Sequence, residues 1–266
     1  MYPLKQSVMT KRLLFLLSIV CLFPFLLKAG WIPVGPQKTS SNPPKVTLIS
    51  DDGNSTVMKI DLSGFQKELL NTSGKTYQTA SLLTESFTNE PGEPAVPYLA
   101  KVLAVPDQAV VSVEVLEVGD IQTFKDIYLP PARTSWYEGK PESPYAEDVS
   151  AYQSYNKYPG NMVSVDPPSV FRDFRIARIS VYPVQYIPAE KELQVASSVT
   201  VRVTYSTGKA VNPKTSQQRP IAPSYGKLYK NFIFNYESVL NKLYGGEELG
   251  HELMLCIMPD EFEASF

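Results

Sequence analysis

Two side chains of this sequence could form a nucleophilic pair, the thiol of Cys256 and the imidazole of His251, its single histidine. Such a pair must lie within hydrogen-bonding reach, about 3 Å. Both residues lie in or beside the apolar run 253–258, which predicts a buried strand, and they are five positions apart. In a strand this spacing puts them on opposite faces, about 16 Å apart along the strand. The sequence therefore predicts a core cysteine and no catalytic dyad.

Motifs for other chemistries are missing from the sequence. It has no Cys/His cluster at zinc-ligand spacing, no glycine-rich phosphate loop and no Gly-x-Ser-x-Gly element. The acidic pair Asp51-Asp52 precedes Gly53-Asn54. We interpret these four residues as a hairpin turn rather than a calcium loop, because no further ligands follow at loop spacing.

The charge of the chain limits its partners. The net charge is −2 and the isoelectric point about 5.6, so no global field attracts nucleic acid or an anionic membrane. Arg172, Arg175 and Arg178 recur along one segment. The simpler interpretation is a solvated or salt-bridged strand, and the alternative is a cationic surface for a partner.

Residues 1–30 have the pattern of a cleaved export signal. Lys5, Lys11 and Arg12 precede an apolar run over 13–27, which is shorter than the about 20 residues of a membrane span. Small residues follow the run, and we expect cleavage at Ala29 or Gly30. We therefore expect a secreted or cell-surface protein with no membrane attachment after cleavage.

Two alternatives to cleavage are an uncleaved anchor and a lipoprotein signal that ends at Cys21. Pro24 disfavours the anchor, and bulky Ile19 and Val20 disfavour the lipoprotein signal. Export with cleavage leaves Cys256 as the single cysteine, so we expect no internal disulfide.

The elements that follow are typical of an antiparallel β-sandwich. Short alternating strands are predicted at 46–49, 56–62, 97–105 and 110–118, at 174–186, and over 193–205, where Val199, Val201 and Val203 face one way. The apolar phase changes faces at Val115-Leu116, which predicts a bulge. Residues 129–168 form a long loop, rich in tyrosine and proline, that we expect to be functional or to hold small elements of its own.

The C-terminal part has a different character. Residues 212–223 form a polar connector, and apolar residues from Leu228 to Leu243 recur at helical spacing. Gly245-Gly246 ends that pattern, and the buried strand 253–258 precedes Asp260, which can cap a helix. We interpret residues 251–266 as the truncated start of an α/β domain.

Three segments resemble the propeptide of the gingipain-type cysteine peptidases. They are a Gly-x-Pro motif at 92–97 with a Val-Pro step at 105–106, the specific segment 171–188 with the strand at 199–205, and a closing segment at 225–236. Residues 253–262 resemble the first strand of the peptidase domain, and Val96 departs from the family's leucine.

The resemblance implies a jelly-roll-like β-sandwich prodomain that keeps a secreted cysteine endopeptidase latent and helps it to fold. Its partner would be the cognate peptidase domain of the same polypeptide, and calcium would belong to that missing domain. The family's catalytic His and Cys lie downstream, and no residue here matches them. We expect no peptidase activity and no cofactor in this chain.

Three basic residues are candidates for roles in latency. The loop 129–168 is the one large enough to cross a cleft, and Arg133, after the stiff Pro130-Pro131, or Lys140 would enter a pocket for basic residues. Lys242 lies in the predicted domain junction, 241–252, and is the candidate processing site.

The predicted organisation is a signal peptide (1–30), a linker (31–45), a β-sandwich prodomain (46–211), a connector with a helical junction (212–250) and the start of an α/β domain (251–266). The rival interpretation is an exported adhesion or carbohydrate-binding module. Such a module would use exposed aromatic side chains as a flat binding face.

Overall fold

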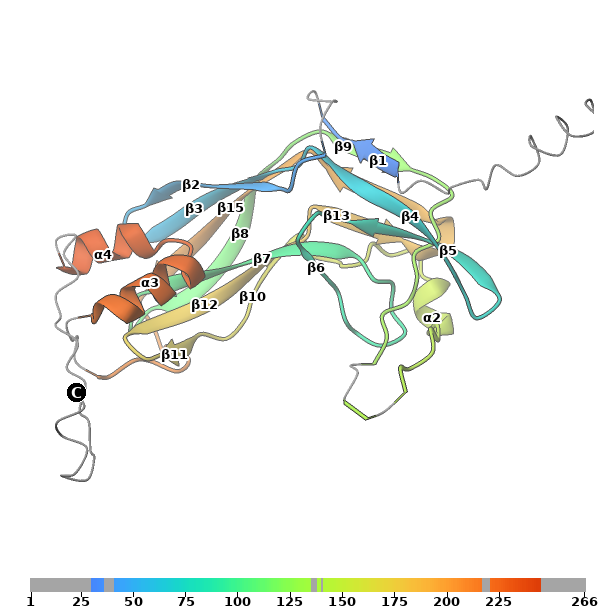
Figure 1. Cartoon of the computed structure of the whole chain (residues 1–266). Coiled ribbons are helices and arrows are strands. Elements are labelled where there is room, and N and C mark those ends of the chain that lie inside the picture. The colour runs from blue at the N-terminus through green and yellow to red at the C-terminus, as the bar shows by residue number, and fades with distance from the viewer. Residues whose placement is uncertain (1–29, 36–40, 135–137, 140, 217–220, 245–266) are drawn as a thin grey trace, which may run out of the picture.

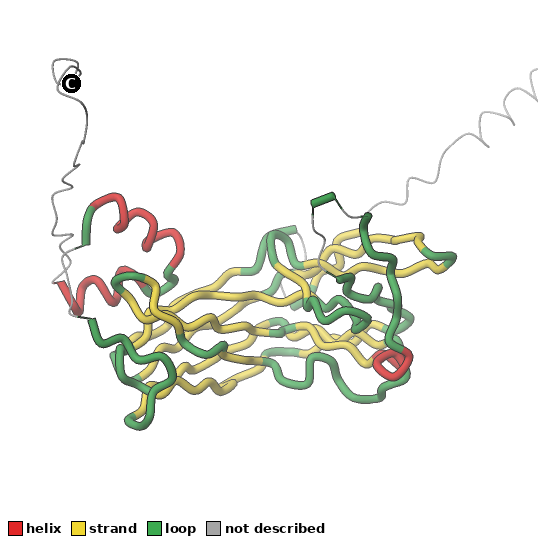
Figure 2. Tube along the Cα trace, turned by 90° about the horizontal axis from the view of Figure 1, so that it is seen from below, coloured by secondary structure: helices red, strands yellow, loops and turns green. Residues whose placement is uncertain are grey.

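The computed structural model describes residues 30–35, 41–134, 138–139, 141–216 and 221–244. It is mainly β, and every strand pairing in it is antiparallel. The body is elongated, with two helices at one end and a short helix toward the other (Figures 1 and 2). The predicted fold class, an antiparallel β protein followed by short helices, is confirmed.

Two sheets form the half of the body next to the C-terminal helices. One has the order β2-β3-β15-β8, and the other has the order β10-β12-β7-β6 with β11 also on β12. The first comprises β2 (Lys45–Asp51), β3 (Ser55–Asp61), β15 (Ser198–Ser206) and β8 (Val110–Val118). The second comprises β10 (Val163–Val165), β11 (Ser169–Phe171), β12 (Phe174–Val181), β7 (Pro97–Val105) and β6 (Ser86–Phe87).

Two three-stranded sheets form the other half. One is β1-β4-β5, and the second is β13-β14-β9. Their strands are β1 (Gly30–Pro33), β4 (Gly64–Thr72), β5 (Lys75–Ser81), β13 (Val184–Ile187), β14 (Glu192–Ala196) and β9 (Ile121–Phe124). One continuous apolar core joins both halves.

The predicted strand 193–205 is divided between the halves. β14 and β15 meet at Ser197, whose amide donates to Asp120 O and whose carbonyl accepts from Leu62 N, both at 2.8 Å. Neither bond belongs to the hydrogen-bonding ladder of β14 or of β15. The predicted strand 193–205 therefore forms two strands, one in each of two sheets.

The alternating valines determine which face of the sheet is buried. Val199, Val201 and Val203 of β15 are fully buried, and Val111, Val113 and Val115 of β8 pack against the same core. In the β8–β15 ladder Val201 pairs with Val115 while Thr200 pairs with Glu117. Leu116 is therefore the extra residue of a bulge, as predicted.

Helices are short. Among the described residues before Ile221 they are α2 (Val149–Tyr152) and the 3-10 helix η1 (Pro188–Glu190), in agreement with the low helical content predicted for this part. The C-terminal segment forms two helices, α3 (Pro223–Phe232) and α4 (Tyr236–Tyr244), where the sequence indicated one continuous series. The break has a physical cause: Ile233 pairs with Val102 of β7, and Phe234 N donates to Val102 O at 2.8 Å.

The N-terminal boundary also differs from the simplest reading of the sequence. Gly30–Pro33, at the end of the predicted signal and the start of the predicted linker, pairs as β1 with β4. Gly64 of β4 has a φ of +157°, and a Cβ there would meet Trp31 at 2.7 Å. The close approach of the indole thus depends on this glycine.

Arg175 is a buried side chain that connects separate segments of the body. Its side chain is 1% exposed, and its guanidinium donates to Pro106 O and Ala109 O, at 2.7 and 2.9 Å. Further donations reach Val211 O and Asn212 O at 2.8 and 3.1 Å. Arg175 therefore fastens the β7–β8 turn and the start of the connector to β12.

The other two arginines of this segment form surface pairs. Arg178 pairs with Asp166, and Arg172 pairs with Asp173 and lies 3.5 Å from the ring centroid of Tyr225. The interpretation of this segment as a salt-bridged strand is confirmed for these two residues. Arg175 does not belong to the alternative, a cationic surface for a partner, because its side chain is buried.

We predict that Arg175→Ala lowers the free energy of unfolding by about 3 kcal/mol or more, because it leaves several backbone carbonyls buried without donors. Arg202→Ala is the matched control, since its exposed ion pair with Glu114 contributes less than about 1 kcal/mol. Urea denaturation of both variants measures the difference. Equal effects of the two substitutions would contradict the role assigned to Arg175.

Candidate functional site: the long loop and the C-terminal clasp

The loop 129–168 lies against the body at both of its ends. Near its start, Ala95 N donates to Pro130 O and Ala132 N donates to Glu93 O, at 2.9 and 2.7 Å. Farther along, Tyr158 and Tyr186 exchange two backbone hydrogen bonds of 2.7 Å. The loop also contains α2 and β10, which confirms the prediction that it holds small elements.

Glu147 is the polar anchor in the middle of the loop. Its Oε1 accepts from the hydroxyls of Tyr77 and Tyr128, at 2.7 and 2.6 Å. Its Oε2 pairs with Lys75 Nζ at 2.6 Å. One carboxylate of the loop therefore binds three side chains of the body, two of them from β5.

The charge states in this cluster follow from burial and these bonds. Burial, and then the hydrogen bond to Glu147, raise the pKa of the Tyr77 and Tyr128 hydroxyls, so both remain donors. Burial acts to raise the pKa of Glu147, but the bonds from Lys75, Tyr128 and Tyr77 outweigh it and lower that pKa below 4.5. Glu147 is ionised at neutral pH.

The tyrosines of this region pack on one another. The rings of Tyr77 and Tyr128 stack with their centroids 5.0 Å apart, and the ring of Tyr152 meets that of Tyr128 edge-on, with centroids 5.8 Å apart. The hydroxyl of Tyr152 donates to Leu129 O. Of the loop's described tyrosines, Tyr155 is the exposed one, at 75%. This packing argues against the flat aromatic face that a carbohydrate-binding module would present.

Arg133 closes the base of a smaller loop within the long one. Its guanidinium pairs with Glu142 and lies 4.7 Å from the ring centroid of Tyr145. Ser143 Oγ donates to Thr134 O at 3.0 Å beside this pair. The two sides of the segment 134–142 are thus held together at their base, next to a cavity of about 370 Å³.

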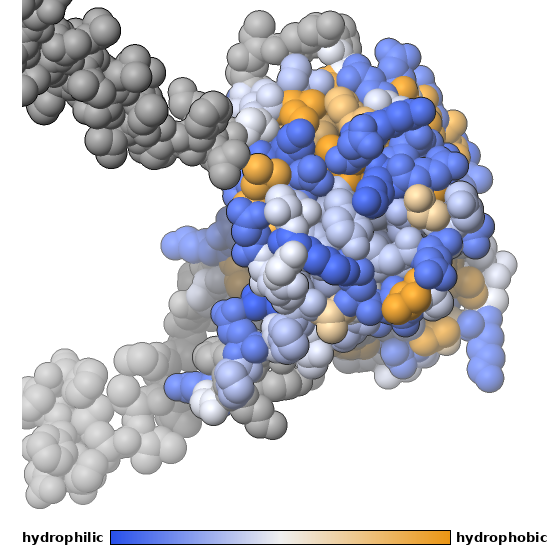
Figure 3. All heavy atoms as spheres, turned by 90° about the vertical axis from the view of Figure 1, so that its right-hand side faces the viewer, coloured by the Kyte–Doolittle hydropathy of each residue, from blue (hydrophilic) through white to orange (hydrophobic). Residues whose placement is uncertain are grey.

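The other candidate of this loop, Lys140, lies outside the described residues, and its described neighbours Gly139 and Pro141 are exposed. Figure 3 shows this end of the body as mostly hydrophilic, with apolar residues in separate spots. Specific polar side chains, rather than one broad apolar patch, dominate this surface.

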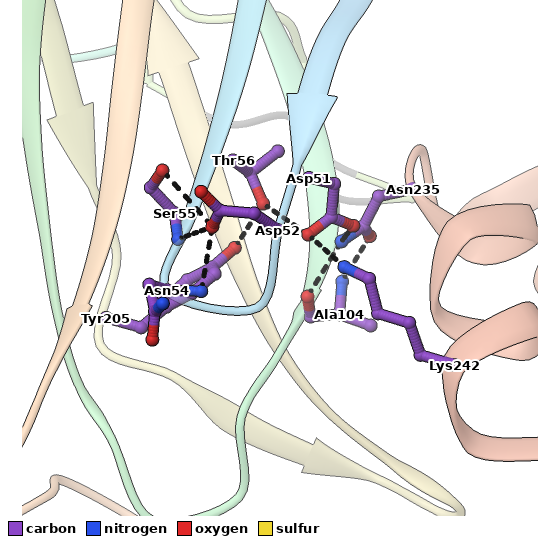
Figure 4. A network of polar contacts seen from close by, with 9 residues as sticks. All are labelled: Asp51, Asp52, Asn54, Ser55, Thr56, Ala104, Tyr205, Asn235 and Lys242. Atoms are coloured by element: carbon purple, nitrogen blue, oxygen red, sulfur yellow. Dashed lines mark hydrogen bonds and ion pairs between the residues drawn. The ribbon is translucent and has the colours of Figure 1, made fainter.

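A second polar cluster joins the C-terminal helices to the body (Figure 4). Asp51, at the end of β2, pairs with Lys242 Nζ at 2.9 Å and accepts from Asn235 Nδ2 at 3.1 Å. Asn235 also binds both backbone groups of Ala104 in β7. The amide of Ala104 donates to Asn235 Oδ1 at 2.8 Å, and Asn235 Nδ2 donates to Ala104 O at 3.0 Å. We call Asp51, Asn235 and Lys242 the clasp.

The turn beside the clasp explains the acidic pair in the sequence. Asp52 Oδ1 accepts from the amides of Asn54 and Ser55, at 2.9 and 2.7 Å, and Asp51 is engaged by the clasp. These partners confirm the turn interpretation. The residues that the structure describes contain no group of three or more His, Cys, Asp or Glu suited to a metal ion.

Two of the remaining sequence candidates, Lys242 and Gly30, lie among the described residues. Lys242 lies in the last turn of α4, and Gly30 is the first residue of β1. Ala29, His251 and Cys256 lie outside the described residues. No helix in the described part of the chain is long and apolar enough to cross a membrane.

Sequence reasoning missed the roles of Glu147 and Asn235. Glu147 was visible only as one of several acids in the loop, and its partners Lys75 and Tyr77 are about 70 residues away. Ile233 and Phe234, next to Asn235, blur the helical spacing, and this was the local signal of the contact that Asn235 makes with β7.

We predict that Glu147→Gln lowers the free energy of unfolding by about 1–3 kcal/mol at pH 7, because charge-assisted bonds to three side chains are weakened. Because the pKa of Glu147 is lowered by folding, its contribution is present above about pH 4.5 and is lost as the pH falls below that value. The difference between variant and wild type should therefore shrink in acid. Denaturation series at pH 7 and pH 4 measure it, and a difference that grows in acid would contradict this assignment.

Comparisons with known proteins agree with this architecture. The Propeptide_C25 family model matches residues 36–243. Gingipain R2 of Porphyromonas gingivalis is 25% identical over 250 residues, which are 92% of this chain and 33% of that protein. Lys-gingipain of the same organism is 26% identical over 170 residues, 62% of this chain and 10% of that protein.

Two solved structures have a similar fold. One is described as the complex of Porphyromonas gingivalis RgpB pro- and mature domains; its matched chain has a TM-score of 0.65 and 23% identity, over 73% of this chain and 97% of that one. The other, described as structural insight into zymogenic latency of gingipain K, has a TM-score of 0.59 and 21% identity, over 68% of this chain and 100% of that one.

The described residues span most of the matched family model, and the chain spans about a third of the length of Gingipain R2. The chain belongs to the Propeptide_C25 family of gingipain-type propeptides.

Proposed function

We propose that this chain is the pro-region of an exported gingipain-like cysteine endopeptidase precursor, and that it keeps the peptidase domain latent and aids its folding. The observation that carries the proposal is the loop 129–168, held on a rigid β body by Glu147 and by backbone bonds at both ends. A loop whose ends are fixed before binding loses less entropy when it docks into a cleft. The partner is the peptidase domain of the same polypeptide, and any calcium belongs to that domain.

The inhibitory contact is assigned to a basic residue of this loop, with Arg133 and Lys140 as the two candidates. Arg133 must leave Glu142 before it can enter a specificity pocket, so its docking costs the free energy of that pair. If Arg133 instead stays in place, it supports the segment that contains Lys140. Either residue then contributes to inhibition, but in different ways.

We predict that substitution of the residue that fills the pocket weakens inhibition of the mature cognate peptidase by about 2–4 kcal/mol. The test titrates the peptidase with this chain carrying Arg133→Ala or Lys140→Ala. Lys157→Ala, an exposed basic residue of the same loop, is the control and should leave the inhibition constant unchanged.

Glu142→Gln separates the two roles of Arg133. It frees Arg133 from its pair, so inhibition should improve if Arg133 enters the pocket and weaken if Arg133 only supports the loop. Inhibition unaltered by all of these substitutions would remove this loop from the mechanism.

Export is the second part of the proposal. β1 begins at Gly30, and Gly30 pairs with Lys67 of β4, so cleavage after Ala29 keeps this strand whole. We predict that the exported protein begins at Gly30. N-terminal sequencing of material recovered outside the cell tests this, and a first residue beyond Pro33 would contradict it, because β1 would be lost.

A further inference from the structure

An ion pair connects the last turn of α4 to the body. Lys242 Nζ, on a side chain that is 38% exposed, reaches Asp51, whose side chain is 4% exposed. A cavity of about 290 Å³ lies next to this pair, lined by Val239 and Lys242 of α4 and by Ala104, Val105 and Phe174 of the body. A helix above such a space has fewer apolar contacts to keep it in place.

The start of α4 is fixed more firmly. Asn235, 1% exposed, binds both backbone groups of Ala104, and Tyr236 and Leu240 belong to a second apolar cluster with Tyr229 and Ile233. α4 has nine residues, and an isolated helix of that length is marginal in water. The contact of Lys242 with Asp51 therefore helps to hold the last turn of α4 in place.

We infer that the Asp51–Lys242 ion pair shields the peptide bond after Lys242 from proteolysis, and that Asp51 is a positioning residue that controls processing there. The inference rests on the proposed pro-region function, because it takes Lys242, the processing candidate from the sequence, as the position of the cut. In the step concerned, water adds to the Lys242–Leu243 amide, leaving a carboxylate on Lys242 and an amine on Leu243.

The geometry explains the shielding in two ways. An endopeptidase that prefers lysine must take the ammonium group into its own pocket, but here that group is paired with a buried carboxylate. The enzyme also needs an extended backbone around the bond, and residues 242–244 are helical. Cleavage after Lys242 therefore requires the ion pair to open and the last turn of α4 to unwind.

The proposed cut lies after α3 and after most of α4, so both helices stay covalently attached to the prodomain fragment. Their packing on the β body through the second apolar cluster is also kept after the cut. The opening needed for cleavage is confined to the last turn, and the rest of the fold can remain intact.

The experiment digests the 266-residue chain with a lysine-specific endopeptidase and follows each cut by mass spectrometry. In the wild type, cleavage after Lys242 should be slower than cleavage after Lys209, which is exposed in the segment after β15. Asp51→Asn should speed cleavage after Lys242 by about tenfold to a hundredfold, as loss of a charge-assisted bond to a buried carboxylate implies when cleavage follows local opening. Cleavage after Lys209 should not change.

Asp52→Asn is the matched control. Asp52 is the next residue in the same turn, and its carboxylate binds Asn54 and Ser55, not α4. This variant should leave cleavage after Lys242 at the wild-type rate. An Asp51→Asn protein that is cut after Lys242 no faster than wild type, or no faster than Asp52→Asn, would overturn the inference.

Faster cleavage after Lys101 in β7 would reveal that Asp51→Asn unfolds the body. In that case a second measurement, on another variant, tests the inference. Hydrogen exchange of Lys242→Gln should then show faster exchange in the last turn of α4 and unchanged exchange in β15. Unchanged exchange in α4 would overturn the inference. Because the added endopeptidase is not the cognate one, these results stand apart from the inhibition assay, and failure of either proposal leaves the other intact.

Discussion

Burial of the valine face of β15 is the constraint on which the other features of this molecule depend. Val199, Val201 and Val203 are fully buried in a core that extends through both halves of the body. An alternating strand can bury only one face, so the register of β3, β15 and β8 is determined by this burial. The resulting body is the rigid platform on which the long loop and the C-terminal helices are placed.

Buried or half-buried polar groups then fasten the irregular segments to that platform. Glu147 holds the long loop, Arg175 holds the β7–β8 turn and the connector, and Asn235 holds the junction of α3 and α4. Each uses donors and acceptors that no regular ladder satisfies. A buried polar group without its partner lowers the stability of the fold. These three contacts therefore determine where the loops lie, while the core determines where the strands lie.

The two functional regions lie toward opposite ends of an elongated body (Figures 1 and 2). The loop with Arg133 and Glu147 is toward one end, and the clasp with Lys242 is at the other. Under the proposed function, the peptidase domain would contact the loop, whereas processing would take place next to the clasp. Latency and processing would then be controlled at separate places, so one can be altered by substitution without the other.

The sequence by itself indicated strands β2, β3, β7, β8, β12 and β15, the turn at Asp51-Asp52, the bulge at Leu116 and the family, because alternation, turn residues and motifs are local properties of the chain. It also singled out Arg133 and Lys242 as basic residues in the loop and the junction. It did not predict β1, β4, β5, β6 or β9. Only the tertiary structure decided that Arg175 is buried, that Glu147 anchors the loop and that Lys242 pairs with Asp51 across 191 residues. Those outcomes depend on which strands lie side by side, and spacing along the chain carries no record of that.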